Sequence, residues 1–290
     1  MAGSPMDEAS APDAVRRAKP RDPVFIKRVL SALLLAPFAL VLVWYGEQPF
    51  AIFVAAFAAA MGWEWVRMSD KAAPPRAFAI ATATAVGAAL LAWQGEGLTS
   101  SLWTLVWIVG GAVCAALDRR PRGGAWEAFV GAAYISGAAA ALVALRNAEA
   151  GGLDAVLFLL AVVWAADTAA YLVGTWVGGP KLLPSASPNK TWSGLIAGLA
   201  GGIGAGWLTA ELIGADPHYA LLAAAPTALA AVGGDLVMSL AKRRFGVKDA
   251  GTLIPGHGGV LDRVDALMLA VLVAGVMAAF APAGWPGAGS

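Results

Sequence analysis

The chain has 290 residues, of which 59% are hydrophobic and 13% are charged, and its mean hydropathy is +0.69. Soluble domains carry about 25% charged residues, so this composition indicates a membrane protein. A single cysteine excludes an intramolecular disulfide and a cysteine-rich metal site, and the net charge of +1 indicates no particular partner.

The apolar pattern predicts the order of the helices along the chain. Residues 1–23 are rich in alanine, proline and charge, which predicts a disordered cytoplasmic tail without a cleavable signal peptide. Nine apolar segments follow, each close to the roughly 20 residues that span hydrocarbon. They lie at about 29–45, 49–66, 77–94, 101–117, 125–145, 153–173, 191–213, 219–241 and 265–283. We therefore predict an all-α polytopic membrane protein, with five spans in 24–150 and four spans in a catalytic region at 151–290.

The basic residues predict the orientation of these spans. With the N-terminus in the cytoplasm, every lysine and arginine except Arg146 lies in a cytoplasmic segment. These segments are the tail with the start of the first span, 67–76, 118–124, 174–190 and 242–264. An excess of lysine and arginine on the cytoplasmic side is the usual bias of membrane proteins. The C-terminus is then expected on the outer side.

Glycines recur every four residues in the seventh span, TWSGLIAGLAGGIGAGW, at Gly194, Gly198, Gly202 and Gly206. On a helix this spacing makes a smooth stripe that another helix backbone can approach closely. We interpret the stripe as a packing face without a ligand role.

Acidic residues stand at the inner ends of two spans. The sixth span ends in WAADTAAYLVG, with Asp167 and Tyr171 one turn apart, and the eighth ends in VGGDLVMSLAKRR, with Asp235, Ser239 and Lys242 on one face. A carboxylate at membrane depth costs a few kcal/mol on insertion scales, so it usually faces a cavity, a cation or a partner.

The loop after the eighth span, GVKDAGTLIPGHGGVLDRVDAL, gathers more charge. Asp262 and Asp265 start the ninth span three residues apart, and the glycine-rich turn offers N–H groups that can approach phosphate. Carboxylate oxygens suit Mg²⁺, which is usually held by one or two carboxylates plus substrate phosphates. Acids, a metal and a basic loop together indicate phosphoryl or nucleotidyl transfer.

Each residue also has a structural interpretation. Asp235 can pair with a nearby lysine or arginine, Asp262 and Asp265 can be acids favoured at a helix N-terminus, and His257 can be a turn residue. The basic run 242–244 can serve orientation alone. Glu64, in GWEWVRM, is expected near the inner interface in a pair with Arg67.

The segment SLAKRRFGVKDAGTLIPGHGGVLDRVD, residues 239–265, resembles the signature of the phosphatidate cytidylyltransferases, also called CDP-diacylglycerol synthases. The signature reads Ser, two residues, Lys-Arg, four residues, Lys-Asp, a Pro-Gly-His-Gly-Gly turn and Asp-Arg-x-Asp, and each position is matched. DTAAYLVG and KLLPSASPNKTWSG resemble two earlier segments of the same family. Three positions depart from the usual pattern of the family. Thr175 stands where a basic residue is common, Asn189 where a lysine is common, and Ser193 where a glutamate is common.

The resemblance implies the reaction CTP + phosphatidate → CDP-diacylglycerol + pyrophosphate, with metal-binding aspartates at Asp235 and Asp262. We add Asp265 as a third candidate metal ligand because of its position. We assign catalysis to Lys248, Asp249, His257, Arg263 and Asp167. We assign substrate binding to Ser239, Lys242, Arg243, Lys190, Tyr171, Pro255, Gly256, Gly258 and Gly259.

The expected cofactor is Mg²⁺, with a second cation left open, and the expected partners are CTP, phosphatidate, the bilayer and a second copy of the chain, without nucleic acid. The expected location is the inner membrane with the site facing the cytoplasm. Another CTP-dependent lipid enzyme, of the polyprenol or phytol kinase type or the archaeal CDP-lipid type, is the nearest alternative. An ion-coupled transporter would favour internal repeats, and none is visible in the sequence.

Overall fold

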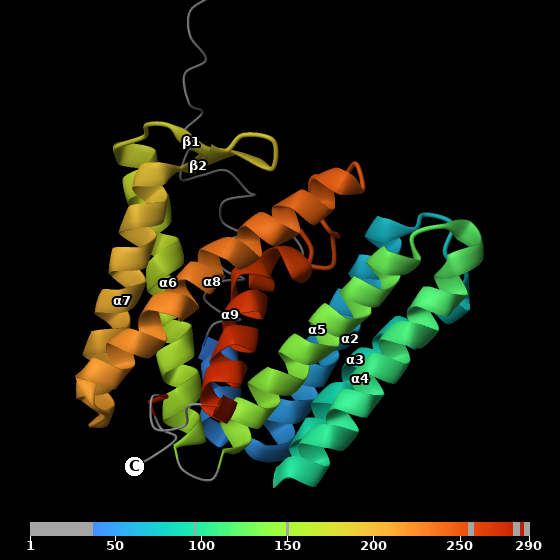
Figure 1. Cartoon of the computed structure of the whole chain (residues 1–290), viewed down its shortest axis with the longest axis horizontal. Helices are drawn as coiled ribbons and strands as arrows, with labels where there is room; N and C mark the ends of the chain where they lie inside the picture. Colours follow the sequence, from blue (N-terminus) through green and yellow to red (C-terminus); the bar gives the residue numbers. More distant parts are fainter. Residues whose placement is uncertain (1–36, 96, 149–150, 255–257, 281–284, 287–290) are drawn as a thin grey trace, which may run out of the picture.

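The computed structural model describes residues 37–95, 97–148, 151–254, 258–280 and 285–286. The long helices are α2 (Glu47–Ser69), α3 (Pro75–Gln94), α4 (Gly97–Arg119), α5 (Ala125–Asn147), α6 (Gly152–Trp176), α7 (Trp192–Ile213), α8 (Pro217–Arg244) and α9 (Leu261–Phe280). A short 3₁₀ helix, η1 (Arg120–Arg122), follows α4, and a hairpin of β1 (Lys181–Leu183) and β2 (Ser187–Thr191) separates α6 from α7 (Figure 1).

The predicted all-α membrane architecture is confirmed. Within the described part of the chain, eight helices of 20 to 28 residues are long and apolar enough to cross a membrane. At 1.5 Å per residue, 20 residues reach about 30 Å, the thickness of the hydrocarbon core. These eight helices correspond to the second to ninth predicted spans. Residues 37–45 are helical and form the described end of the first predicted span, whereas the predicted tail lies outside the described residues.

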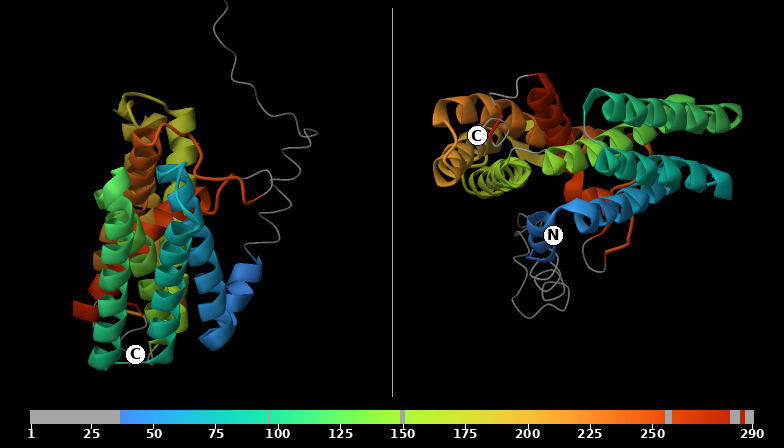
Figure 2. Two further views of the ribbon diagram at one scale, coloured as in Figure 1. Left: turned by 90° about the vertical axis from the view of Figure 1, so that its right-hand side faces the viewer. Right: turned by 90° about the horizontal axis from the view of Figure 1, so that it is seen from below.

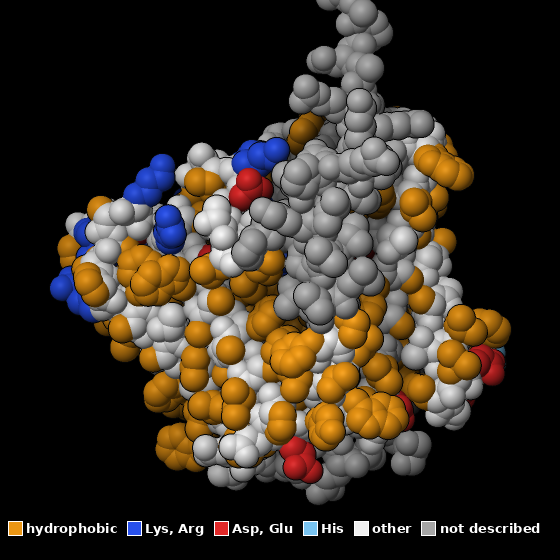
Figure 3. All heavy atoms as spheres, turned by 180° about the vertical axis from the view of Figure 1, so that it is seen from behind, with side chains coloured by type: hydrophobic (Ala, Val, Ile, Leu, Met, Phe, Trp, Pro, Cys, Tyr) orange, Lys and Arg blue, Asp and Glu red, His pale blue; other side chains and the backbone are white. Residues whose placement is uncertain are grey.

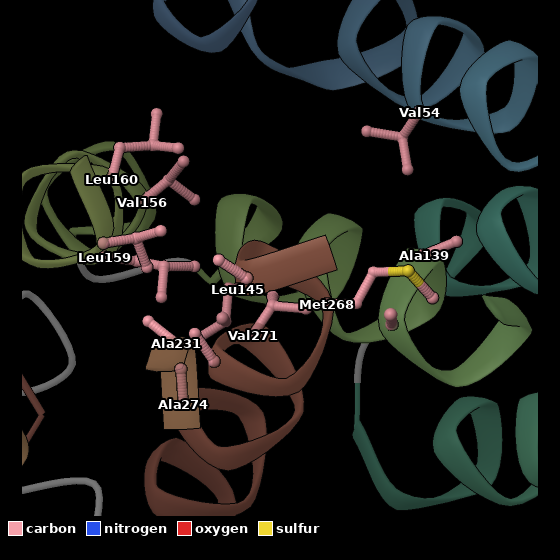
Figure 4. Close-up of a cluster of buried hydrophobic side chains, with 14 of the residues drawn as sticks. Val54, Ala139, Leu145, Val156, Leu159, Leu160, Ala231, Met268, Val271 and Ala274 are labelled. Atoms are coloured by element: carbon pink, nitrogen blue, oxygen red, sulfur yellow. The ribbon is translucent and has the colours of Figure 1, made fainter. Parts of the chain in front are cut away.

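The helices form two groups that meet at α9. Helices α2 to α5 stand side by side, α6 to α8 form the second group, and α9 packs on α8, α5, α6 and α2 (Figures 1 and 2). Buried side chains from several of these helices converge around α9, among them Val271 and Ala274 of α9, Leu159 of α6 and Ala231 of α8 (Figure 4). This placement puts the start of α9, with its acidic residues, between the two groups.

The glycine stripe of α7 is a packing face, as predicted. Gly194, Gly198, Gly202 and Gly206 are all buried. A Cβ atom on Gly206 would lie 2.6 Å from Ala224 Cβ of α8, and one on Gly194 would lie 2.9 Å from the carbonyl oxygen of Ala170 in α6. Both neighbouring helices therefore approach α7 more closely than any larger residue would allow.

The four connections predicted to be cytoplasmic lie at the same end of the molecule, which is the upper end in Figure 1. Lysine and arginine side chains gather toward this end above an apolar band (Figure 3). Arg146 lies at the opposite end, where its guanidinium donates to the carbonyl oxygens of Val43 at 2.6 Å and Trp44 at 3.0 Å. The one arginine outside the predicted bias thus stabilises the end of the 37–45 helix.

Candidate active site

Asp235 lies toward the upper end of α8 and carries two polar contacts. Ser239, one turn later, donates from Oγ to Asp235 Oδ1 at 3.3 Å, and Lys190 Nζ lies 2.5 Å from Asp235 Oδ2. Lys190 belongs to β2, so the hairpin brings a cation to the carboxylate. The hairpin itself is held to α8, because Arg243 Nε donates to the carbonyl oxygen of Ala186 at 3.4 Å.

Lys242 joins the ends of α8 and α9. Its ammonium group lies 2.8 Å from Asp262 Oδ1 and 3.7 Å from Asp265 Oδ2, and the lysine is only 9% exposed. The predicted clustering of Asp262 and Asp265 on one side of α9 is therefore present. The ammonium group thus lies between the two carboxylates and offsets part of their negative charge.

The second oxygen of Asp262 binds the glycine loop, which comprises residues 250–251 and 258–260 between α8 and α9. Asp262 Oδ2 accepts hydrogen bonds from the backbone N–H groups of Ala250 at 2.9 Å and Gly259 at 3.1 Å. One carboxylate thus joins the middle of the connection between α8 and α9 to its last residues. Gly258, inside this turn, has a φ of 86°, a left-handed conformation that favours glycine.

The remaining predicted residues lie around this cluster or away from it. Asp167 of α6 is close enough to Asp235 and Lys190 to interact electrostatically. Tyr171, one turn further along α6, is 72% exposed and points outward. Lys248, Asp249 and Arg263 are exposed and form no ion pair within the described part of the chain. Pro255, Gly256 and His257 lie outside the described residues.

Glu64 departs from the sequence-based expectation. It is 1% exposed, and in place of a pair with Arg67 its two oxygens accept from the backbone N–H groups of Val260 at 3.0 Å and Leu261 at 2.9 Å. The Glu64–Arg67 prediction is wrong because the free N–H groups at the start of α9 lie nearer and favour a carboxylate. The acid in an otherwise apolar run was the sole sequence signal.

A cavity of about 460 Å³ opens beside this cluster. Most of its wall is apolar, including Val54, Ala139, Leu160 and Met268, which Figure 4 labels. Its upper end is polar and is lined by Asp167, Asp262, Arg263 and Asp265. A volume of this size is typical of small-molecule sites, and its lining suits a ligand with a long apolar part and a head bound to a metal ion.

A family model described as "Cytidylyltransferase family" matches residues 26–281. This chain belongs to the cytidylyltransferase family. A Brucella suis protein named phosphatidate cytidylyltransferase is 40% identical over 250 residues, which cover 84% of this chain and 89% of that protein. A Pseudomonas aeruginosa protein of the same name is 33% identical over 257 residues, covering 85% of this chain and 94% of that protein. Similarity therefore extends through nearly all the described helices, well beyond the motifs of the C-terminal half.

The donor atoms of this cytidylyltransferase-family site can be compared with the needs of Mg²⁺. Among the described residues, no three histidine, cysteine, aspartate or glutamate side chains form a group able to hold a metal ion. Asp235 and Asp262 nevertheless have one oxygen each oriented by a hydrogen bond and the other facing a lysine ammonium. The oxygens that face the lysines already lie beside a positive charge. One or two carboxylates are enough to bind Mg²⁺ when substrate phosphates supply its other oxygen ligands.

Proposed function

We propose that the chain is a phosphatidate cytidylyltransferase, which makes CDP-diacylglycerol and pyrophosphate from CTP and phosphatidate. The observation that carries this proposal is the cavity described above, whose apolar wall leads to a polar end lined by three aspartates and Arg263. The wall suits acyl chains, and the polar end suits a phosphate that binds together with Mg²⁺. The relatives that share most of the chain carry the name of this activity.

The chemistry requires little proton transfer. A phosphomonoester carries a charge of about −1.5 to −2 near neutral pH, as phosphorylated side chains do, so the lipid nucleophile is already ionised. An oxygen of the lipid phosphate bonds to the α-phosphorus of CTP while the bond from that phosphorus to the bridging oxygen of the β-phosphate breaks. Pyrophosphate leaves with the electron pair of that bond.

The main obstacle is repulsion between the two polyanions. We assign Lys190 and Lys242 to hold phosphate oxygens, since both ammonium groups stand beside the carboxylate cluster. Asp235 and Asp262 would hold Mg²⁺, which when bound neutralises phosphate charge, and Asp265 and Asp167 lie next to them. A second cation would require Asp167 or Asp265 to move closer to the other carboxylates, because no three of these side chains form a metal-binding group among the described residues.

The exposed basic residues complete the assignment. Lys248 and Arg263 would offset the charge that develops on pyrophosphate. Well-placed donors of this kind contribute about 3–4 kcal/mol each to transition-state stabilisation. His257 stays a candidate for assisting the leaving group, and Asp249 stays a candidate catalytic residue.

The membrane setting fits these substrates. CTP and pyrophosphate are water-soluble, whereas phosphatidate stays in the leaflet, so the site should lie at the cytoplasmic face of the inner membrane. The charge bias of the connections supports that orientation. We also propose a homodimer, which native mass spectrometry of the detergent-solubilised protein would test.

The direct test is a product assay with purified protein in lipid nanodiscs. CTP and phosphatidate should yield CDP-diacylglycerol and pyrophosphate in equal amounts, and Asp235→Asn should abolish turnover. Asp154→Asn, at the outer start of α6, is the matched control and should retain it. Formation of CDP and a lipid phosphate from CTP and a lipid alcohol would instead indicate a kinase.

A further inference from the structure

Glu64 connects two parts of the chain that are 196 residues apart. It lies on α2, outside the motifs that carry the family resemblance, and its carboxylate accepts the N–H groups of Val260 and Leu261 at 3.0 and 2.9 Å. The connection between α8 and α9 runs beside α2 in the views of Figure 2. Glu64 therefore contacts the one segment that holds the glycine loop and the start of α9.

The hydrogen-bond partners of Glu64 are backbone N–H groups. Within the described part of the chain no lysine, arginine or histidine nitrogen lies within 4 Å of its carboxylate, although the side chain is 1% exposed. The first N–H groups of a helix lack partners within the helix, and its N-terminus favours negative charge. Glu64 thus binds the N-terminus of α9 specifically.

Two glycines close around the carboxylate. A Cβ atom on Gly251 would lie 2.5 Å from Glu64 Oε1, and one on Gly259 would lie 2.7 Å from Glu64 Oε2. The loop backbone can reach these positions only without side chains. The same two glycines lie at the contacts of Asp262. Asp262 Oδ2 accepts from the N–H group of Gly259 and from that of Ala250, the residue before Gly251.

The two acids therefore hold consecutive parts of one loop. Asp262 binds the N–H groups of residues 250 and 259, and Glu64 binds those of residues 260 and 261. Any displacement at 260–261 moves Asp262 directly, because it is the next residue of α9. Because Asp262 pairs with Lys242, such a displacement also disturbs that ion pair.

We propose that Glu64 is a positioning residue that fixes the glycine loop and the Asp262 carboxylate without touching either substrate. Its catalytic consequence rests on the proposed function, whereas its hold on the loop does not. Glu64→Gln keeps the size of the side chain but places an NH₂ donor against one of the two N–H donors. The loop should then loosen while the helices stay packed.

The test compares Glu64→Gln with Glu127→Gln, which removes a carboxylate at the same end of the molecule that pairs with Arg244. Hydrogen exchange of peptides covering 246–264 should quicken at least tenfold in Glu64→Gln and stay unchanged in Glu127→Gln. The kcat of folded Glu64→Gln should fall at least tenfold, and the KM for phosphatidate should stay near its wild-type value.

A purely structural role would give a different result. It would lower the amount of folded protein, and the folded fraction would keep wild-type exchange in 246–264 and wild-type kcat, which would overturn the proposal. If the wild-type protein does not catalyse cytidylyl transfer, the proposed function is wrong. The hydrogen-exchange comparison of Glu64→Gln with Glu127→Gln still tests the hold of Glu64 on the loop.

Gly251→Ala tests the same contact from the other side, should Glu64→Gln fail to fold. Its methyl group would push the Glu64 carboxylate away, so exchange in 246–264 should again quicken at least tenfold. Gly110→Ala is the control, because a Cβ there meets nothing within 4 Å. Wild-type exchange in Gly251→Ala would overturn the proposal.

Discussion

Lys242 and Asp262 form a buried ion pair that ties the end of α8 to the start of α9, with 2.8 Å between Nζ and Oδ1. The side chains are 11% and 7% exposed, so water screens neither charge well. The same lysine lies 3.7 Å from Asp265. Removing its charge would leave two acids without their shared cation.

Lys242→Met should therefore destabilise the protein strongly. Loss of one partner of a buried pair costs about 3–5 kcal/mol because the other charge stays buried. Thermal unfolding in detergent should show this loss, and the double variant Lys242→Met/Asp262→Asn should be more stable than the sum of the single changes predicts, by about 0.5–3 kcal/mol. Additive effects would contradict a direct interaction.

Lys190→Gln should reduce catalysis with little change in stability. Its pair with Asp235 is partly exposed, at 23% and 27%, and such pairs contribute about 0–1 kcal/mol. If Lys190 holds a phosphate of CTP by a charged hydrogen bond, kcat/KM for CTP should fall on the order of tenfold to a hundredfold. Steady-state kinetics measure this, with Lys181→Gln in the same hairpin as the control. Equal effects of both changes would indicate nonspecific attraction of CTP.

Gly206→Ala should weaken the packing of α7 although alanine favours helices. The added methyl would lie 2.6 Å from Ala224 Cβ, and overpacking typically costs about 1–3 kcal/mol. Gly204→Ala, half a turn away, meets nothing within 4 Å and should be neutral or stabilising. Melting temperatures of the two variants provide the comparison, and an unchanged value for Gly206→Ala would contradict the close helix contact.

Val54→Trp should obstruct the apolar cavity. Val54 lines its wall, so the larger ring should raise the KM for phosphatidate several-fold and leave the KM for CTP unchanged. Val109→Trp, on the exposed side of α4, is the control. A rise in both KM values in Val54→Trp would place the lipid elsewhere.

The orientation can be tested with engineered cysteines, because Cys114 is the single cysteine of the chain. In a Cys114→Ser background, Lys71→Cys at the upper end should be protected from a membrane-impermeant maleimide in intact spheroplasts. His218→Cys at the lower end should be labelled. The reverse pattern would contradict the predicted cytoplasmic site.

The sequence predicted those features that depend on local spacing. Apolar length gave the spans, the four-residue repeat gave the α7 packing face, and helical periodicity placed Ser239 beside Asp235. Contacts between distant segments were beyond such reasoning. Nothing local indicates that Lys190 reaches Asp235, or that Glu64 binds residues nearly 200 positions later, because both contacts depend on how α2, the hairpin, α8 and α9 pack together.

The position of the transferred label tests the central claim most directly. Purified protein in nanodiscs with phosphatidate is supplied with CTP carrying ³²P at either the α- or the γ-phosphate. The account predicts that α-label enters the lipid while γ-label leaves as pyrophosphate. Label from the γ-phosphate in the lipid, or no labelled lipid from either substrate, would contradict it.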